Sequence, residues 1–155
     1  MTTFVFNEAK RAIGEGEIDW PNASIGMVLV ETGSAAGSSR NANFLSDISP
    51  LNRCTAPGYS ANYPDDATVT GLSVQEVGGS NLCRYHAANT IFDNITAYVG
   101  SEVIIGAIYY LRGSPTDTDA TRMPLVFTDW AGVTVDPDGS RITVRPPSTG
   151  VFYLG

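Results

Sequence analysis

The chain contains one histidine, His86, and two cysteines, Cys54 and Cys83, and these residue types commonly serve in nucleophilic catalysis. A serine or cysteine nucleophile would need His86 as its base, because the sequence holds no second imidazole. Cys83 precedes His86 by three positions, and in a strand this odd spacing places the two side chains on opposite faces. The G-x-S-x-G motif of serine hydrolases is absent. We therefore interpret His86 as a polar strand residue, with a small hydrolase as an alternative hypothesis.

Paired carboxylates are a second candidate chemistry, because two acids with different pKa values can act as general acid and general base. Three pairs stand beside proline, glycine or threonine: Asp65 with Asp66, Asp117 with Asp119, and Asp136 with Asp138. Aspartate in such surroundings typically accepts backbone hydrogen bonds in a turn. The segment around Asp117 also lacks the central glycine and final glutamate of a calcium loop. We predict turns at all three places, no catalytic, cofactor-binding or metal site, and no enzymatic activity.

The charge balance argues against two classes of partner. The formal net charge is −7, Lys10 is the only lysine, and the arginines are scattered. Nucleic acids and anionic membranes both select clustered basic residues, so neither is expected to bind. No apolar run is long enough to span a membrane. Cys54 and Cys83 lack the spacing of metal ligands, and we interpret them as two free thiols, although a disulfide stays open.

The elements that would position these residues begin with one short helix. Asn7 is a suitable N-cap for a helix that ends at Gly14 or Gly16. Ile25, Met27 and Leu29 then alternate with Gly26, Val28 and Val30, so both faces are apolar, which predicts a buried strand. Residues 33–43 and 50–66 are rich in Gly, Ser, Asn and Pro and are expected to form long loops. Between these loops, Phe44–Ile48 is a short apolar anchor.

The second half of the chain has the pattern of successive strands. We expect Glu102–Leu111, which is β-branched and apolar on both faces, to be central in a sheet, with Gly106 at a bulge or a close neighbour. The other strands are predicted at Thr68–Val77, Leu82–His86, from Leu125, Arg141–Arg145 and Val151–Leu154. The second of these returns across a turn at residues 78–81 to form a hairpin. The sequence thus predicts one domain over residues 1–155, mainly β, as an antiparallel β-sandwich or partial barrel with a short N-terminal helix and long loops.

The start of the chain contains the patterns Asn7-x-x-Lys10, Gly16-x-Ile18-Asp19-Trp20 and Ile25-x-Met27-x-Leu29. With these patterns it resembles a group of small structural proteins from tailed bacteriophages. Further similarities lie at Phe44–Ile48, Gly106–Tyr110 and Pro124–Val126. The resemblance implies a structural protein of the virion, made in the host bacterial cytoplasm. We expect a decoration (cement) protein that binds the major capsid protein or other virion proteins. A homo-oligomer is compatible with this role. A tail, neck or fibre module is the alternative.

Interface candidates are aromatic or arginine residues within segments that otherwise lack a pattern. They fall in an N-terminal arm over residues 2–6, in the loop around residues 40–45 and in the loop around residues 59–63. The candidates are Thr2, Phe4, Phe6, Arg40, Phe44, Tyr59 and Tyr63. A carbohydrate-binding module is a further hypothesis, which would require Trp20, Trp130 and tyrosines to share one exposed face.

Overall fold

A computed structural model describes residues 2–59, 66–93, 95–96, 103–114, 116–130, 135 and 138–155. Most of the regular structure in these residues is antiparallel β, which confirms the predicted fold class. The strands are β1 (Thr2–Val5), β2 (Ile25–Glu31), β3 (Ala67–Val69), β4 (Ser73–Val77), β5 (Leu82–His86), β6 (Thr90–Phe92), β7 (Ile104–Leu111), β8 (Pro124–Asp129), β9 (Ile142–Val144) and β10 (Phe152–Leu154). The helical segments are α1 (Asn7–Gly14) and three short 3-10 helices, η1 (Trp20–Asn22), η2 (Ala35–Ser38) and η3 (Leu45–Asp47).

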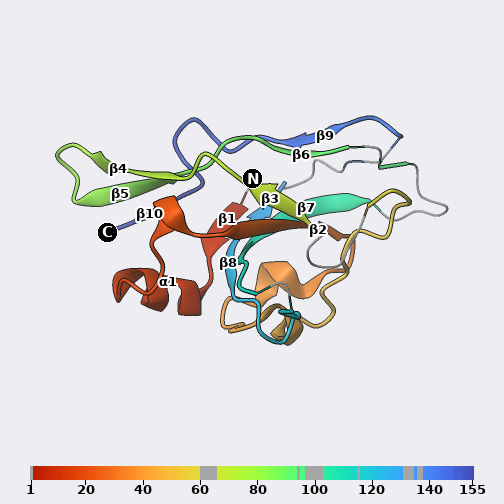
Figure 1. Cartoon of the computed structure of the whole chain (residues 1–155), viewed down its shortest axis with the longest axis horizontal. Coiled ribbons are helices and arrows are strands. Elements are labelled where there is room, and N and C mark those ends of the chain that lie inside the picture. Colours follow the sequence, from red (N-terminus) through yellow and green to blue (C-terminus); the bar gives the residue numbers. More distant parts are fainter. Residues whose placement is uncertain are drawn as a thin grey trace.

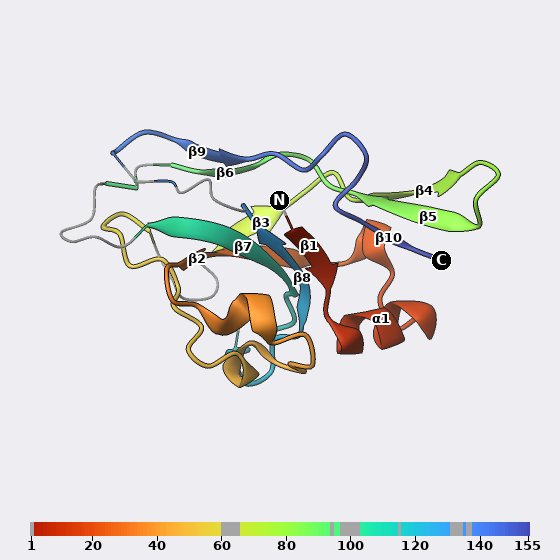
Figure 2. The same ribbon diagram turned by 180° about the vertical axis from the view of Figure 1, so that it is seen from behind.

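A five-stranded sheet in the order β1-β8-β7-β2-β3 forms the middle of the molecule. Figures 1 and 2 show α1 and the 3-10 helices η2 and η3 below this sheet, and the smaller sheets β10-β5-β4 and β6-β9 above it. The prediction of a central strand near residues 102–111 is confirmed, because β7 lies between β8 and β2. Since both faces of the sheet are covered, β2 is buried along its whole length.

Gly106 allows β7 and β8 to approach closely. A Cβ atom at this position would collide with the carbonyl oxygen of Thr128 and would lie 3.0 Å from the ring of Phe127. The pairing of β2 with β7 also shifts in register between Val30 and Glu31, opposite this glycine. The expectation of a bulge or a close neighbour at Gly106 is therefore confirmed.

Helix α1 differs from the prediction at its start. Asn7 is the first helical residue and not the cap, because Phe6 occupies the extended cap position. The predicted N-cap was wrong, since burial of the Phe6 ring in the core fixes where the extended chain ends. The Asn7 side chain instead donates a hydrogen bond to Asn41. Ala9 and Ala12 are buried against the core, as expected for the apolar face of this helix.

The predicted strand over residues 68–77 is two strands in different sheets. Gly71 has a φ of +63° and lies between β3 and β4. A Cβ atom there would approach Ala88 to 2.8 Å, so the turn combines a left-handed backbone with tight packing. The predicted hairpin is confirmed, because β4 pairs with β5 across residues 78–81. Figure 1 shows this hairpin extending to one end of the molecule.

The aromatic core between the layers centres on Trp20, which is 1% exposed. Its ring meets Tyr85 and Phe152 edge-on, and these two rings stack on each other at 4.4 Å. Cys54 is buried and Cys83 half-buried, and both are free thiols as interpreted from the sequence. Among the described residues, no helix is both long and apolar enough to cross a membrane.

Candidate functional site

His86 lies at the end of β5, where its backbone carbonyl accepts a hydrogen bond of 2.8 Å from the Trp20 indole. Its ring Nε2 is buried and has no hydrogen-bond partner within the described part of the chain. In the β4–β5 register, His86 is opposite Ser73 and Cys83 is opposite Glu76. The two side chains therefore point to opposite faces, as expected. Within the described residues, no nucleophile and no carboxylate hydrogen-bonds to the buried His86 Nε2, although Ser73 is its neighbour across the strand pair.

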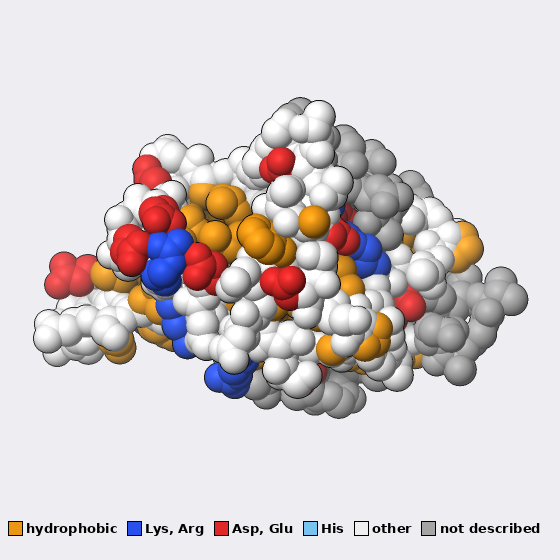
Figure 3. All heavy atoms as spheres, turned by 90° about the horizontal axis from the view of Figure 1, so that it is seen from below, with side chains coloured by type: hydrophobic (Ala, Val, Ile, Leu, Met, Phe, Trp, Pro, Cys, Tyr) orange, Lys and Arg blue, Asp and Glu red, His pale blue; other side chains and the backbone are white. Residues whose placement is uncertain are grey.

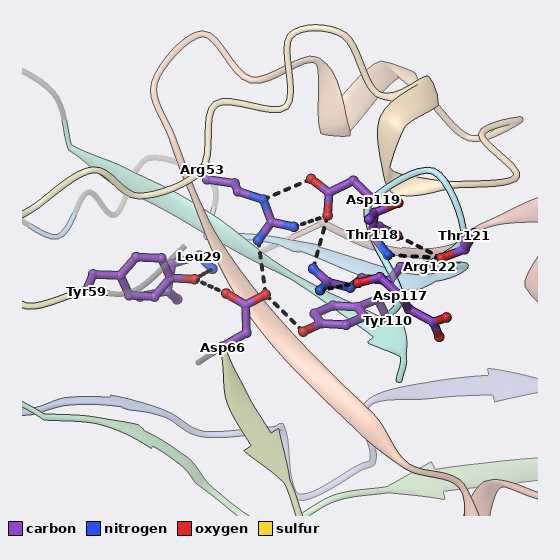
Figure 4. A network of polar contacts seen from close by, with 10 residues as sticks. All are labelled: Leu29, Arg53, Tyr59, Asp66, Tyr110, Asp117, Thr118, Asp119, Thr121 and Arg122. Carbon is purple, nitrogen blue, oxygen red and sulfur yellow. Dashed lines mark hydrogen bonds and ion pairs between the residues drawn. The ribbon is translucent and has the colours of Figure 1, made fainter. Parts of the chain in front are cut away.

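The surroundings of the Asp66 side chain differ from those predicted for a turn aspartate. Its side chain is 0% exposed and forms an ion pair of 3.0 Å with Arg53. It also accepts hydrogen bonds from the hydroxyls of Tyr59, at 3.1 Å, and Tyr110, at 2.9 Å. Figure 4 shows these side chains converging on one carboxylate. Asp66 lies at a bend directly before β3, but its carboxylate is a buried cross-link to three side chains and not an ordinary turn aspartate.

Asp119 extends this cross-link to a second loop. It pairs with Arg53 and, at 3.2 Å, with Arg122 (Figure 4). Arg122 also donates a hydrogen bond to the carbonyl of Asp117. Burial by itself lowers the pKa of Arg53, but the charges of Asp66 and Asp119 outweigh it and raise that pKa. We define Arg53, Asp66, Asp119 and Arg122 as the buried ion network, which ties both loops to the sheet.

The tyrosines around this network remain neutral over an extended pH range. Burial raises the pKa of Tyr59, and the neighbouring charge of Asp66 raises it further. Burial and Asp66 raise the pKa of Tyr110 in the same way. Both hydroxyls therefore stay protonated donors to Asp66, and with their partners already engaged they are poorly placed for proton transfer.

The remaining predicted acidic pairs include one turn that the structure describes. Asp138 fits the predicted turn, because it accepts a 2.9 Å hydrogen bond from the backbone N–H of Ser140. Hydrogen bonds from Ser140 lower the pKa of Asp138. Asp65 and Asp136 lie outside the described residues. Groups of three or more candidate metal ligands are absent from the part of the chain that the structure describes.

A groove of about 500 Å³ runs beside β1, between this edge strand and the C-terminal segment around β10. Figure 2 shows β1 and the C-terminal segment side by side. The groove is lined by Thr3, Phe4, Val5 and Lys10 on one side and by residues 147 and 149–153 on the other. We call it the β1 groove. It combines a sheet edge, a lining of apolar and polar side chains, and a lysine, which is a suitable surface for binding a polypeptide.

No protein-family profile, curated protein or solved structure matches this chain.

The N-terminal interface candidates are placed differently from the predicted free arm. Residues 2–5 form β1, paired with β8, and Phe4 and Phe6 are buried. Residues 2–6 are therefore not an unpatterned arm, because Phe4 and Phe6 pack with each other in the core at 5.1 Å. Their role at an interface stays a prediction. Thr2 contributes its backbone to β1 opposite Asp129. Arg40 is exposed and lies over the Phe4 ring at 4.5 Å, so the structure brings Arg40 and Phe4 together beside the β1 groove.

Phe44 and Tyr59, among the remaining candidates, lie in different surroundings. Phe44 is 40% exposed, and its role at an interface stays a prediction. Tyr59 is held by the ion network: its hydroxyl binds Asp66 and accepts a hydrogen bond from the N–H of Leu29. It is therefore not a free loop aromatic. Tyr63 lies outside the described residues.

The tryptophans required by the carbohydrate hypothesis are separated. Trp20 is buried in the core, whereas Trp130 is half-buried. Trp130 lines a different, mainly apolar hollow of about 250 Å³ with Tyr109 and β9. The two indoles therefore cannot stack on one sugar, and this arrangement weighs against a shared aromatic platform.

Sequence reasoning missed the β1 groove and the ion network for the same reason. Both join segments that are far apart in the chain: residues 3–10 with 147–153, and Arg53 with Asp119. The sequence contained only an indirect sign of the ion network, namely arginines and aspartates in loops that have few hydrophobic residues.

Proposed function

We propose that this protein is a non-enzymatic structural component of a tailed-bacteriophage particle, and specifically a capsid decoration protein. In this role it binds and stabilises the lattice of the major capsid protein. The observation that carries the proposal is the β1 groove, a recess of about 500 Å³ beside an edge strand. The resemblance of residues 4–30 to small virion proteins supports the same class of function.

The loops that lead into β3 and β8 suit a protein that must keep one shape at high copy number. The buried ion network ties them to the five-stranded sheet through Arg53, Asp66 and Asp119. A rigid surface loses less conformational entropy on docking than a mobile one. The net charge of −7 also favours solubility before assembly.

Exposed apolar side chains provide further modest contacts with neighbours. Large hydrophobic residues that remain exposed in the described part of the chain are Phe44, Val74, Ile91 and Tyr153. Single exposed residues are common on soluble proteins. We therefore assign the main contact to the β1 groove, which Tyr153 lines, and treat Phe44, Val74 and Ile91 as secondary.

The test is the protein composition of purified particles from the phage that encodes this chain. We expect a copy number comparable to that of the major capsid protein, and heads assembled without this protein should break at lower temperature. Adding the purified protein back should restore their heat tolerance. Only a few copies per particle would reject a decoration role and favour the tail, neck or fibre. Absence from particles would refute the proposal as a whole.

A further inference from the structure

We propose that the β1 groove binds an acidic, extended segment of a partner protein, which adds a strand to the five-stranded sheet. This inference rests on the proposed function for the identity of the partner, a virion protein. The mode of binding and the chemistry of the segment follow from β1 and its surroundings.

The first argument is the free edge of β1. Phe4 pairs with Phe127, and the N–H of Phe6 donates to the carbonyl of Leu125 at 3.0 Å. Hydrogen-bonding residues alternate in an antiparallel ladder, so Thr3 and Val5 direct their N–H and C=O groups away from β8. No other strand within the described residues pairs with this edge. A new strand would therefore find its backbone partners at Thr3 and Val5.

The second argument concerns the two walls of the groove. Side chains alternate along a strand, so Val5 faces the layer that contains Phe152, whereas Phe4 faces the layer of α1 that carries Lys10. Figures 1 and 2 show these layers on opposite sides of the five-stranded sheet. An added strand would meet an apolar wall on one side and a basic side chain on the other. This geometry selects a segment in which apolar and acidic residues alternate.

The third argument is the distribution of unpaired cations. Arg40 lies over the ring of Phe4, and Arg84 lies over the ring of Tyr153 at 5.7 Å, so both cover residues that line the groove. Within the described residues, neither arginine nor Lys10 forms an ion pair.

Four arginines away from the groove, Arg11, Arg53, Arg122 and Arg141, have carboxylate partners. Arg11, for example, pairs with Glu8, Glu15 and Glu17 next to Lys10, and Figure 3 shows such a basic group enclosed by acidic ones on the face that carries α1. In a chain of net charge −7, cations left free around one groove favour a negatively charged ligand.

A labelled heptapeptide of alternating glutamate and valine, blocked at both ends, tests the proposal by fluorescence polarisation. We expect saturable binding to the full-length protein that weakens with added salt. A lysine–valine heptapeptide should not bind. Equal binding of the two peptides, or no binding of the glutamate–valine peptide, would overturn the proposal.

Thr3→Pro is the sharpest variant, because it removes an outward N–H while the β1–β8 hydrogen bonds stay intact. We expect peptide affinity to fall about tenfold, since a hydrogen bond and backbone access are both lost. Thr3→Val is the matched control and keeps the N–H, so its affinity should stay within about twofold of the parent. Unchanged affinity in a folded Thr3→Pro protein would contradict strand addition.

A second variant does not depend on the backbone of β1. Replacing Lys10 and Arg40 by alanine should weaken binding of the glutamate–valine peptide and flatten its salt dependence. An unchanged salt dependence would contradict the charge argument even if Thr3→Pro failed to fold.

Binding to heads that lack this protein separates the two proposals. If the parent and Thr3→Pro proteins decorate heads equally well, the strand-addition proposal is wrong and the decoration role stands. If the parent binds the peptide in a Thr3-dependent way but does not bind heads, the groove assignment stands and the decoration role is wrong.

Discussion

Asp66→Asn tests whether the buried ion network holds the fold together. The substitution keeps the size of the side chain but removes its charge. Asp66 is fully buried and serves three donors: Arg53, Tyr59 and Tyr110. An amide has one acceptor oxygen and its nitrogen only donates, so at least one donor would lose its partner.

The expected cost follows from the burial of the network. Breaking a buried ion pair by removing one partner costs about 3–5 kcal/mol. Arg53 would keep its contact with Asp119, so we expect the lower end, about 3 kcal/mol. With a urea m-value of about 2 kcal/mol per molar, the midpoint of unfolding would fall by about 1.5 M.

Urea denaturation followed by tryptophan fluorescence measures this loss, since Trp20 lies in the core. Asp138→Asn is the control, because it makes the same chemical change at an exposed turn and should alter stability by less than about 0.5 kcal/mol. Tyr110→Phe combined with Asp66→Asn should cost less than the sum of the single variants, because the two residues share one hydrogen bond. A loss below about 1 kcal/mol for Asp66→Asn would refute a stabilising role for the network.

The remaining predictions concern pH and backbone packing. Burial raises the pKa values of Tyr59 and Tyr109, so the native state keeps protons that the unfolded chain loses above pH 10 or so. The free energy of unfolding should therefore fall as pH rises beyond that value, by up to about 1.4 kcal/mol per pH unit for each tyrosine. Urea titrations between neutral and strongly alkaline pH measure this fall. A free energy of unfolding that does not change with pH would contradict the prediction. Gly106→Ala should destabilise the protein by about 1–3 kcal/mol through collision with Thr128, which is measured as a lower Tm. Gly14→Ala is the control, because a Cβ atom there has no neighbour within 4 Å, and it should be neutral or slightly stabilising. Equal effects of the two substitutions would argue against the close approach of β7 and β8.

Several elements could be predicted because the signal lies in neighbouring residues. Alternation identified β2, and the run of β-branched and aromatic residues identified β7 as central. A glycine-rich turn between two strand patterns was sufficient for the β4–β5 hairpin. In these cases the local preference and the tertiary environment agree.

The wrong predictions fall where tertiary packing overrides a local preference. Asn7 is a good cap by residue type, but burial of Phe6 moves the cap back by one position. Residues 68–77 have a strand pattern throughout, but Gly71 turns the chain from one sheet to the other. Local periodicity contains no information about which sheet a strand joins.

By itself, the sequence determined the mainly β composition, the central position of β7, the hairpin and the acidic surface charge, because each depends on residue type and short-range spacing. Only the tertiary structure decided that Asp66 is a buried cross-link and that Lys10, Arg40 and Arg84 surround one groove. Those arrangements depend on strand order and on contacts between distant segments. A linear pattern cannot encode them, because the same loops could be held against either face or edge of the sheet.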